Sequence, residues 1–105
     1  MDVNRAELQA KYIEPDPYHP GAADVRIVGC GVHVWALIGY LKAIVGDAGI
    51  AEAFERELHA PLGPMKELAV EFGVPVDAVL AAVAYYRDHP QVIDARIAAN
   101  VISAA

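Results

Sequence analysis

Hydrophobic positions along the 105-residue chain recur mainly with the spacing of α-helices. One broad apolar stripe predicts a first core helix over residues 35–46, which we expect to end at Gly46. An inserted amphipathic segment follows at 47–64, where two prolines stop the helix, and a last helix is predicted over 91–102. The stripe of the first core helix comprises Leu37, Ile38, Leu41, Ile44 and Val45, and the apolar face of the inserted helix comprises Ile50, Phe54 and Leu58.

A period of two replaces the helical spacing over residues 24–34. Val25 and Ile27 alternate with other residues before the turn residues Gly29-Cys30-Gly31, and Val32 and Val34 do so after it. This pattern is typical of a short β-hairpin. The stretch "EPDPYHPG" before it holds three prolines and a glycine, which predict a loop.

Residues 65–89 have the layout of a helix-turn-helix. That unit needs a small residue in the first helix, a glycine with a left-handed backbone at the turn, and apolar residues at fixed places. Ala69 and Gly73 meet the first two needs, and an ordinary helical hairpin with a glycine turn is the alternative. The apolar positions of the expected helix-turn-helix core are Leu68, Phe72, Val74, Val79 and Ala82.

The second helix of this unit lacks the residues that read DNA bases. Base readout relies on Arg, Lys, Asn and Gln, whereas Asp77 would repel phosphates. An apolar face with small residues suits packing against protein instead. DNA binding stays open, but not by direct base readout from this helix. The candidate protein-contact face comprises Val76, Asp77, Leu80, Ala81 and Ala84.

These elements predict a single domain over residues 1–105 and a mainly α fold. We expect a helical bundle with a helix-turn-helix-like unit and a short N-terminal β-hairpin. The chain is 56% hydrophobic and 21% charged, which excludes a disordered chain. So much apolar surface in a small domain favours a homo-oligomer, a dimer or larger.

The charge and the single cysteine narrow the classes of function further. A net charge of −6 without a basic segment does not favour a protein that grips nucleic-acid phosphates. No stretch is long enough to span a membrane, and the start lacks the apolar run of a signal peptide. With Cys30 alone, no intramolecular disulfide can form. We therefore expect a cytoplasmic protein.

Candidate chemistry is sparse. Cys30 and His33 form a lone Cys-x-x-His pair, while zinc usually takes four ligands, so no metal or cofactor is predicted. Cys30 as a nucleophile would need a base and an electropositive site, and a structural thiol at a turn is the simpler interpretation. Tyr85 and Tyr86 lack basic neighbours for base stacking, so core or interface packing is favoured. No catalytic residue is predicted, and we expect no enzyme.

Two stretches, "IVGCGVHVWALIGYL" at 27–41 and "VPVDAVLAAVAYYRDHPQVIDARIAAN" at 74–100, resemble a known family. They are similar to the bacterial domain-of-unknown-function family 433, which is grouped with VapB-type antitoxins. Gly29 matches that pattern, while Cys30 replaces its usual Thr. The positions that fit in the second stretch are Tyr85, Tyr86, Arg87, His89, Ile93, Asp94, Arg96 and Ile97.

The resemblance implies a dimeric, non-enzymatic antitoxin-like protein of the bacterial cytoplasm. It also implies pairing with a PIN-type toxin, as in some members, and autoregulation of the operon. The inserted segment 47–64 departs from the family pattern and puts its standard partner surface in question. The alternative is a protein-interaction or scaffold module of helix-turn-helix fold that binds neither DNA nor a toxin.

Overall fold

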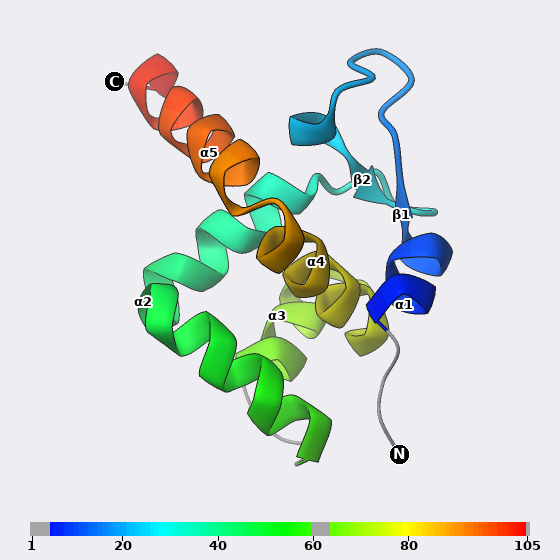
Figure 1. Cartoon of the computed structure of the whole chain (residues 1–105), viewed down its shortest axis with the longest axis vertical. Coiled ribbons are helices and arrows are strands. Elements are labelled where there is room, and N and C mark those ends of the chain that lie inside the picture. The colour runs from blue at the N-terminus through cyan, green and yellow to red at the C-terminus, as the bar shows by residue number, and fades with distance from the viewer. Residues whose placement is uncertain (1–4, 60–63, 105) are drawn as a thin grey trace.

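Helices make up most of the protein, in a computed structural model that describes residues 5–59 and 64–104. Of residues 5, 47–59, 64 and 101–104 it describes the backbone alone. Figure 1 shows the arrangement, and the predicted mainly α fold with a short sheet near the N-terminus is confirmed. The elements in chain order are α1 (Arg5–Tyr12), β1 (Ile13–Glu14), the 3-10 helix η1 (Ala22–Asp24), β2 (Arg26–Ile27), α2 (Val34–His59), α3 (Pro64–Phe72), α4 (Val76–Asp88) and α5 (Pro90–Ala104).

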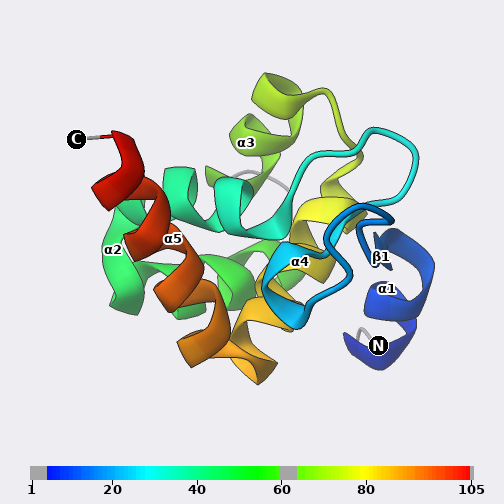
Figure 2. The same cartoon turned by 90° about the horizontal axis from the view of Figure 1, so that it is seen from above.

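Helix α4 lies at the centre of the fold. Every residue from Ala78 to Tyr86 is buried, because α1, α2 and α3 pack around it, as Figures 1 and 2 show. A helix that is apolar on all sides belongs in a core, and the charged residues of α4 stand only near its two ends. The largest fully buried side chains around it are Ile27, Leu37, Ile38, Leu41, Met65, Leu68 and Ile93.

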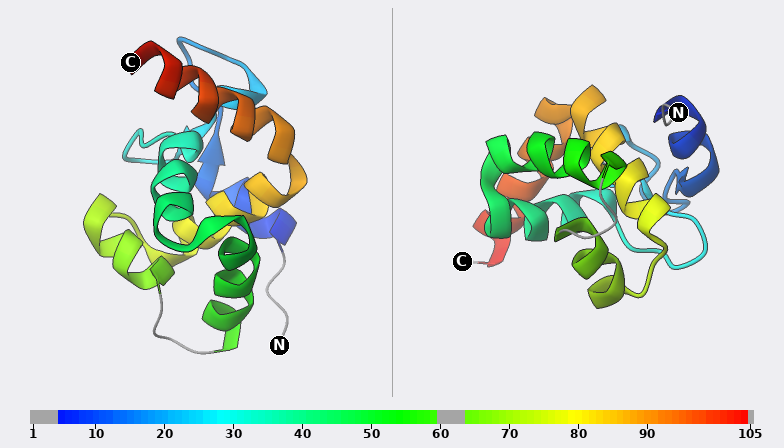
Figure 3. Two further views of the ribbon diagram at one scale, coloured as in Figure 1. Left: turned by 90° about the vertical axis from the view of Figure 1, so that its left-hand side faces the viewer. Right: turned by 90° about the horizontal axis from the view of Figure 1, so that it is seen from below.

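Helix α2 bends sharply at Gly46, which has φ 74° and ψ 175°. This left-handed backbone is open to glycine and rare for other residues, and Figure 3 shows the two arms of α2 meeting at an angle. Gly46 was predicted to end the first core helix. It does interrupt the helix, and a second helical arm follows at once through His59. The apolar face predicted for that arm, Ile50, Phe54 and Leu58, consists of side chains outside the described part of the chain.

The two-stranded antiparallel sheet pairs β1 with β2, placing Ile13 opposite Ile27 and Glu14 opposite Arg26. The predicted hairpin over 24–34 forms only its turn and a single bridge between Arg26 and His33. The Ile27 N–H donates to the Val32 carbonyl at 2.7 Å. The expected second strand is cut short because Val34 already begins α2, so β1 takes its place as the partner of β2.

Candidate functional site

The helix-turn-helix geometry is present in α3 and α4. The chain direction changes by 112° between the two helices, across a turn at residues 73–75, as this motif requires. Gly73 has φ +67°. Its N–H donates to the Val70 carbonyl at 3.2 Å, and the Val74 N–H donates to the Ala69 carbonyl at 2.9 Å. This pair of bonds is the Schellman ending that a left-handed glycine permits.

The predicted helix-turn-helix core packs as the motif demands. Leu68, Ala69 and Val74 are buried, and Val79 and Ala82 are fully so. Phe72 is half-buried and meets the ring of Tyr40 edge-on, with 5.6 Å between centroids. The residues that form the turn and its packing are therefore those that the sequence pattern predicted.

The candidate protein-contact face is mostly buried within the chain, and so is not a surface left open for a partner protein. Leu80 is only 5% exposed, and Ala81 and Ala84 are completely buried. Val76 is half-buried, and Asp77 alone is exposed. The cause is tertiary: α1 packs along α4 and, with α2, covers the surface that a free recognition helix would present. Leu80, Ala81 and Ala84 are therefore covered by other parts of the same chain.

An open groove lies between α2 and α5. It has a volume of about 290 Å³ and none of its lining side chains is charged. Tyr40 is 46% exposed, and Ile44, one helical turn further along α2, is 56% exposed. This groove could not be predicted from the sequence, because its two walls are far apart in the chain. Its lining residues are Trp35, Ala36, Gly39, Tyr40, Ile97 and Asn100.

Trp35 stands at one end of this groove with a charged side chain over its ring. The guanidinium of Arg96 lies 4.4 Å from the ring centre of Trp35, a cation–π arrangement. The imidazole of His33 stacks nearby at 6.0 Å between centroids. The indole Nε1 of Trp35 is buried and has no hydrogen-bond partner within the described part of the chain.

Beside the groove, the proline-containing loop between β1 and η1 is fixed by Asp16. This carboxylate is only 5% exposed. Its Oδ2 lies 2.8 Å from Nε2 of His33, and its Oδ1 accepts the N–H groups of Tyr18 and His19 at 2.8 and 3.3 Å. The bond with His33, and then the backbone N–H of Tyr18, lower the pKa of Asp16 below its ordinary value.

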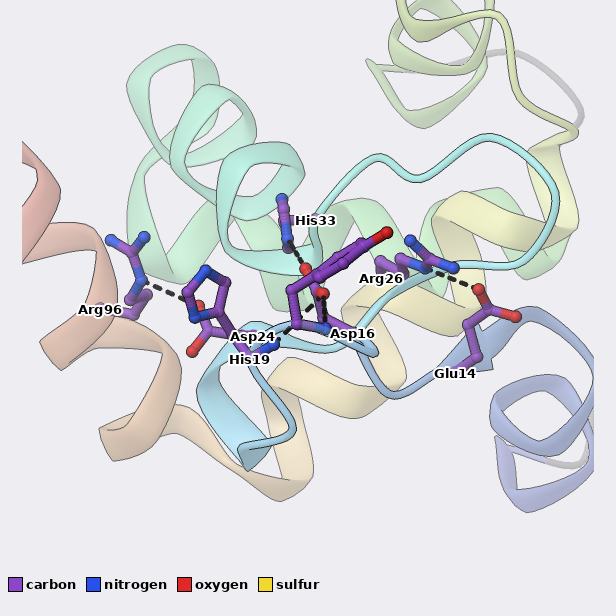
Figure 4. Close-up of polar contacts among 8 residues, drawn as sticks. Glu14, Asp16, His19, Asp24, Arg26, His33 and Arg96 are labelled. Atoms are coloured by element: carbon purple, nitrogen blue, oxygen red, sulfur yellow. Dashed lines mark hydrogen bonds and ion pairs between the residues drawn. The ribbon is translucent and has the colours of Figure 1, made fainter.

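Three further contacts brace the same loop and its flanks. Arg26 pairs with Glu14 at 2.6 Å, and Arg96 pairs with Asp24 at 3.1 Å. The Tyr85 hydroxyl donates to the Ala22 carbonyl at 2.6 Å. Figure 4 shows the side chains of Arg26 and Glu14 directed toward one another, and likewise Arg96 and Asp24, and His33 and Asp16. A loop without regular structure is therefore held at several points along its length.

Tyr86, Lys42 and Asp94 join three helices. The Tyr86 hydroxyl donates to Oδ1 of Asp94 at 2.9 Å, and Nζ of Lys42 donates to the same oxygen at 2.8 Å. Burial, and then the bond to Asp94, raise the pKa of Tyr86. Burial also raises the pKa of Tyr85. Both rings are buried in the core, which agrees with the predicted packing in the core or an interface.

Cys30 and His33 do not converge on a ligand. Cys30 is exposed on the turn, where its thiol lies 3.9 Å from the Ile27 carbonyl oxygen, while Nε2 of His33 is engaged by Asp16. Among the side chains that the structure describes, no group of three or more His, Cys, Asp or Glu residues could hold a metal ion.

Comparison with known proteins finds no matching family model, no matching curated protein and no matching solved structure. The resemblance to family 433 thus has no support from these comparisons and stays a prediction.

Among the described helices, none alone is long and apolar enough to cross a membrane. Residues 65–72 and 76–88 reach that length and composition only together, across their bend of 112°.

Proposed function

We propose that this protein is a non-enzymatic, dimeric protein-binding module built on a helix-turn-helix scaffold. The observation that carries the proposal is the burial of α4 from Ala78 to Tyr86. A helix that reads bases must enter the major groove with free side chains. Here the corresponding helix, α4, is buried in the core instead. The net charge of −6 also disfavours contact with phosphates.

The polar side chains support a structural role over catalysis. Two sets of polar side chains form hydrogen bonds that join different parts of the fold. Asp16 bonds with His33, and Asp94 accepts from both Lys42 and Tyr86. Catalytic acids and bases instead need access to a substrate in a cleft. The antitoxin-like role, with a PIN-type toxin as partner and control of its own operon, is the specific form of this proposal that the resemblance implies. The alternative is a scaffold module without a toxin or DNA.

Dimerisation is assigned to the groove between α2 and α5. The exposed ring of Tyr40 is part of its uncharged lining, and the exposed side chain of Ile44 lies one helical turn further along α2. A two-fold interface brings identical patches together. Between two copies that each carry −6, an uncharged patch is the surface that meets with the least repulsion.

Light scattering at micromolar concentration tests this proposal. We expect a dimer for the unchanged chain and a monomer for Tyr40→Glu, because the interface would bury a new charge on each copy. Val70→Glu is the matched control, since Val70 is 80% exposed on α3 and should leave the mass unchanged. A monomeric unchanged protein would contradict the dimer. Retention of duplex DNA at about 150 mM salt would favour the antitoxin-like form, which controls its own operon, over the scaffold alternative that binds no DNA.

A further inference from the structure

Trp35, in the first turn of α2, is contacted by two side chains that come from different parts of the chain. The imidazole of His33 stacks on its ring, with 6.0 Å between centroids and 25° between planes, within the range of aromatic pairs. The guanidinium of Arg96, on α5, lies 4.4 Å from the ring centre in a cation–π contact. The ring is half-buried and packs against the hydrophobic core, so it is a fixed support for both.

The same two side chains bond the carboxylates that flank the exposed part of the loop between β1 and η1. Nε2 of His33 lies 2.8 Å from Oδ2 of Asp16, at the start of the loop. Nε of Arg96 lies 3.1 Å from Oδ1 of Asp24, at the end of η1. Figure 4 shows both pairs. Contacts therefore run without a break from the loop, through the indole ring, to α5.

These polar contacts depend on the ring for their strength. An ion pair between partly exposed side chains contributes little when both must first be ordered, and the side chains of Arg96 and Asp24 are 33% and 25% exposed. A planar guanidinium that already stacks on an indole loses less freedom when it meets a carboxylate. Removing the ring should therefore weaken the contacts at both ends of the loop.

We propose that Trp35 couples the loop to α5, so that the two regions open together rather than separately. A change imposed on α5 then alters the opening of the loop, and by thermodynamic linkage a change in the loop alters α5. This coupling goes beyond the proposed function and does not depend on the dimer, since all of its contacts lie within one chain. Independent contacts would instead leave the loop indifferent to α5.

Chymotrypsin cleavage after Tyr18, in the full chain at neutral pH, measures the opening of the loop. Tyr18 is 84% exposed, but the backbone must leave its turn to enter a protease, so at low protease concentration the rate follows the open population. Trp35→Leu should raise the rate about tenfold, and Arg96→Gln about threefold or more, although neither residue belongs to the loop. Trp35→Phe keeps an aromatic ring and should stay within about threefold of the unchanged chain.

Arg26→Gln is the matched control. The ion pair of Arg26 with Glu14 is similarly exposed, at 29% and 32%, and also lies beside the loop. Its loss should change the rate less than about twofold. An effect as large as that of Arg96→Gln would show that any lost ion pair loosens the loop, and the coupling through Trp35 would be wrong.

A double variant shows whether Arg96 acts through the ring. In a chain that already carries Trp35→Leu, Arg96→Gln should add less than about twofold. A factor as large as in the unchanged chain, or no effect of Arg96→Gln on its own, overturns the coupling. Mass spectrometry of the fragments separates loop opening from unfolding, because an unfolded chain is also cut after Tyr85 and Tyr86, which are buried in the fold.

Hydrogen exchange tests the coupling from the opposite direction and leaves the ring in place. Asp16→Asn weakens the contact at the start of the loop, far from α5 in the sequence. It should speed the exchange of α5 amides around Arg96 by about threefold or more, while the amides of α4 keep their protection. Faster exchange that is confined to the loop, or that spreads equally over α4, overturns the coupling.

Discussion

Helix α4 and the loop between β1 and η1 are both fixed in this protein, but by opposite means. Helix α4 is held by apolar contact on every side, and its only charged residues lie near its ends. The loop has no regular structure over residues 15–21. It is held by a buried carboxylate, by ion pairs beside it and by a tyrosine hydroxyl.

The difference assigns separate tasks to the two regions. Burying one Leu or Val side chain contributes about 1.5–3 kcal/mol, whereas an ion pair with partly exposed partners contributes about 0–1 kcal/mol. The stability of the fold therefore resides mainly around α4. The polar contacts instead select one conformation of the loop.

Leu80→Lys should produce the largest effect, because Leu80 is 5% exposed in the centre of α4. The change removes apolar packing and brings a charge into the core, so the unfolding free energy should fall by about 3 kcal/mol or more. Thermal unfolding followed by circular dichroism measures it. Val70→Lys, on the exposed side of α3, is the control and should lie within about 0.5 kcal/mol of the unchanged chain.

If α4 read DNA bases, the opposite result would be expected for Leu80→Lys. There the added lysine would approach phosphates and strengthen binding to duplex DNA. A Leu80→Lys protein that keeps its melting temperature and its mass and gains affinity for DNA would show that α4 is accessible. The contrast between a buried helix and an exposed loop would then be wrong.

Acid should release the loop while α4 persists. The folded-state pKa of Asp16 is lowered, so its contribution is present above the unfolded pKa, near 4, and is lost as the pH falls through the lowered value. Trp35, the only tryptophan, stacks at 6.0 Å on His33, the partner of Asp16. Its fluorescence should change below about pH 4 before the helical signal does.

Asp16→Asn provides the control for that transition. It removes the titrating carboxyl at the same site, so the fluorescence change below about pH 4 should disappear or shrink. Loop release and loss of helical signal at one common pH would indicate that the loop and the core unfold as one unit.

Cys30→Ser should have the smallest effect of the three. The thiol is exposed, and its single described contact is a long one to the Ile27 carbonyl. The unfolding free energy should stay within about 1 kcal/mol of the unchanged chain, with the same oligomeric mass under reducing conditions. Stoichiometric zinc in the unchanged protein that this variant lacks would refute a purely structural thiol.

The sequence predicted best what depends on near neighbours. The turn at Gly73 and the small residue Ala69 act within a few positions of each other, and the bend at Gly46 depends on that residue alone. Local chemistry of this kind is readable because the same backbone demands recur in many folds.

The rest depends on pairings across long stretches of the chain. Nothing local indicates that α1, whose sequence is largely polar, packs beside α4. Strand β1 has only two residues, too few for a recognisable alternation. Asp16 and His33 meet across 17 positions, and Trp35 and Ile97 share a groove from helices that are far apart in sequence.

The exposed Cys30 offers a practical handle on the assembly. As the single cysteine, it can carry one maleimide-linked spin label at a known position on the turn, without engineering any other residue. In a closed two-fold dimer the single pair of labels reports one distance, so a double electron–electron resonance measurement would yield one narrow distribution. An open head-to-tail array would yield a ladder of distances, and the spectrum alone would tell the two geometries apart.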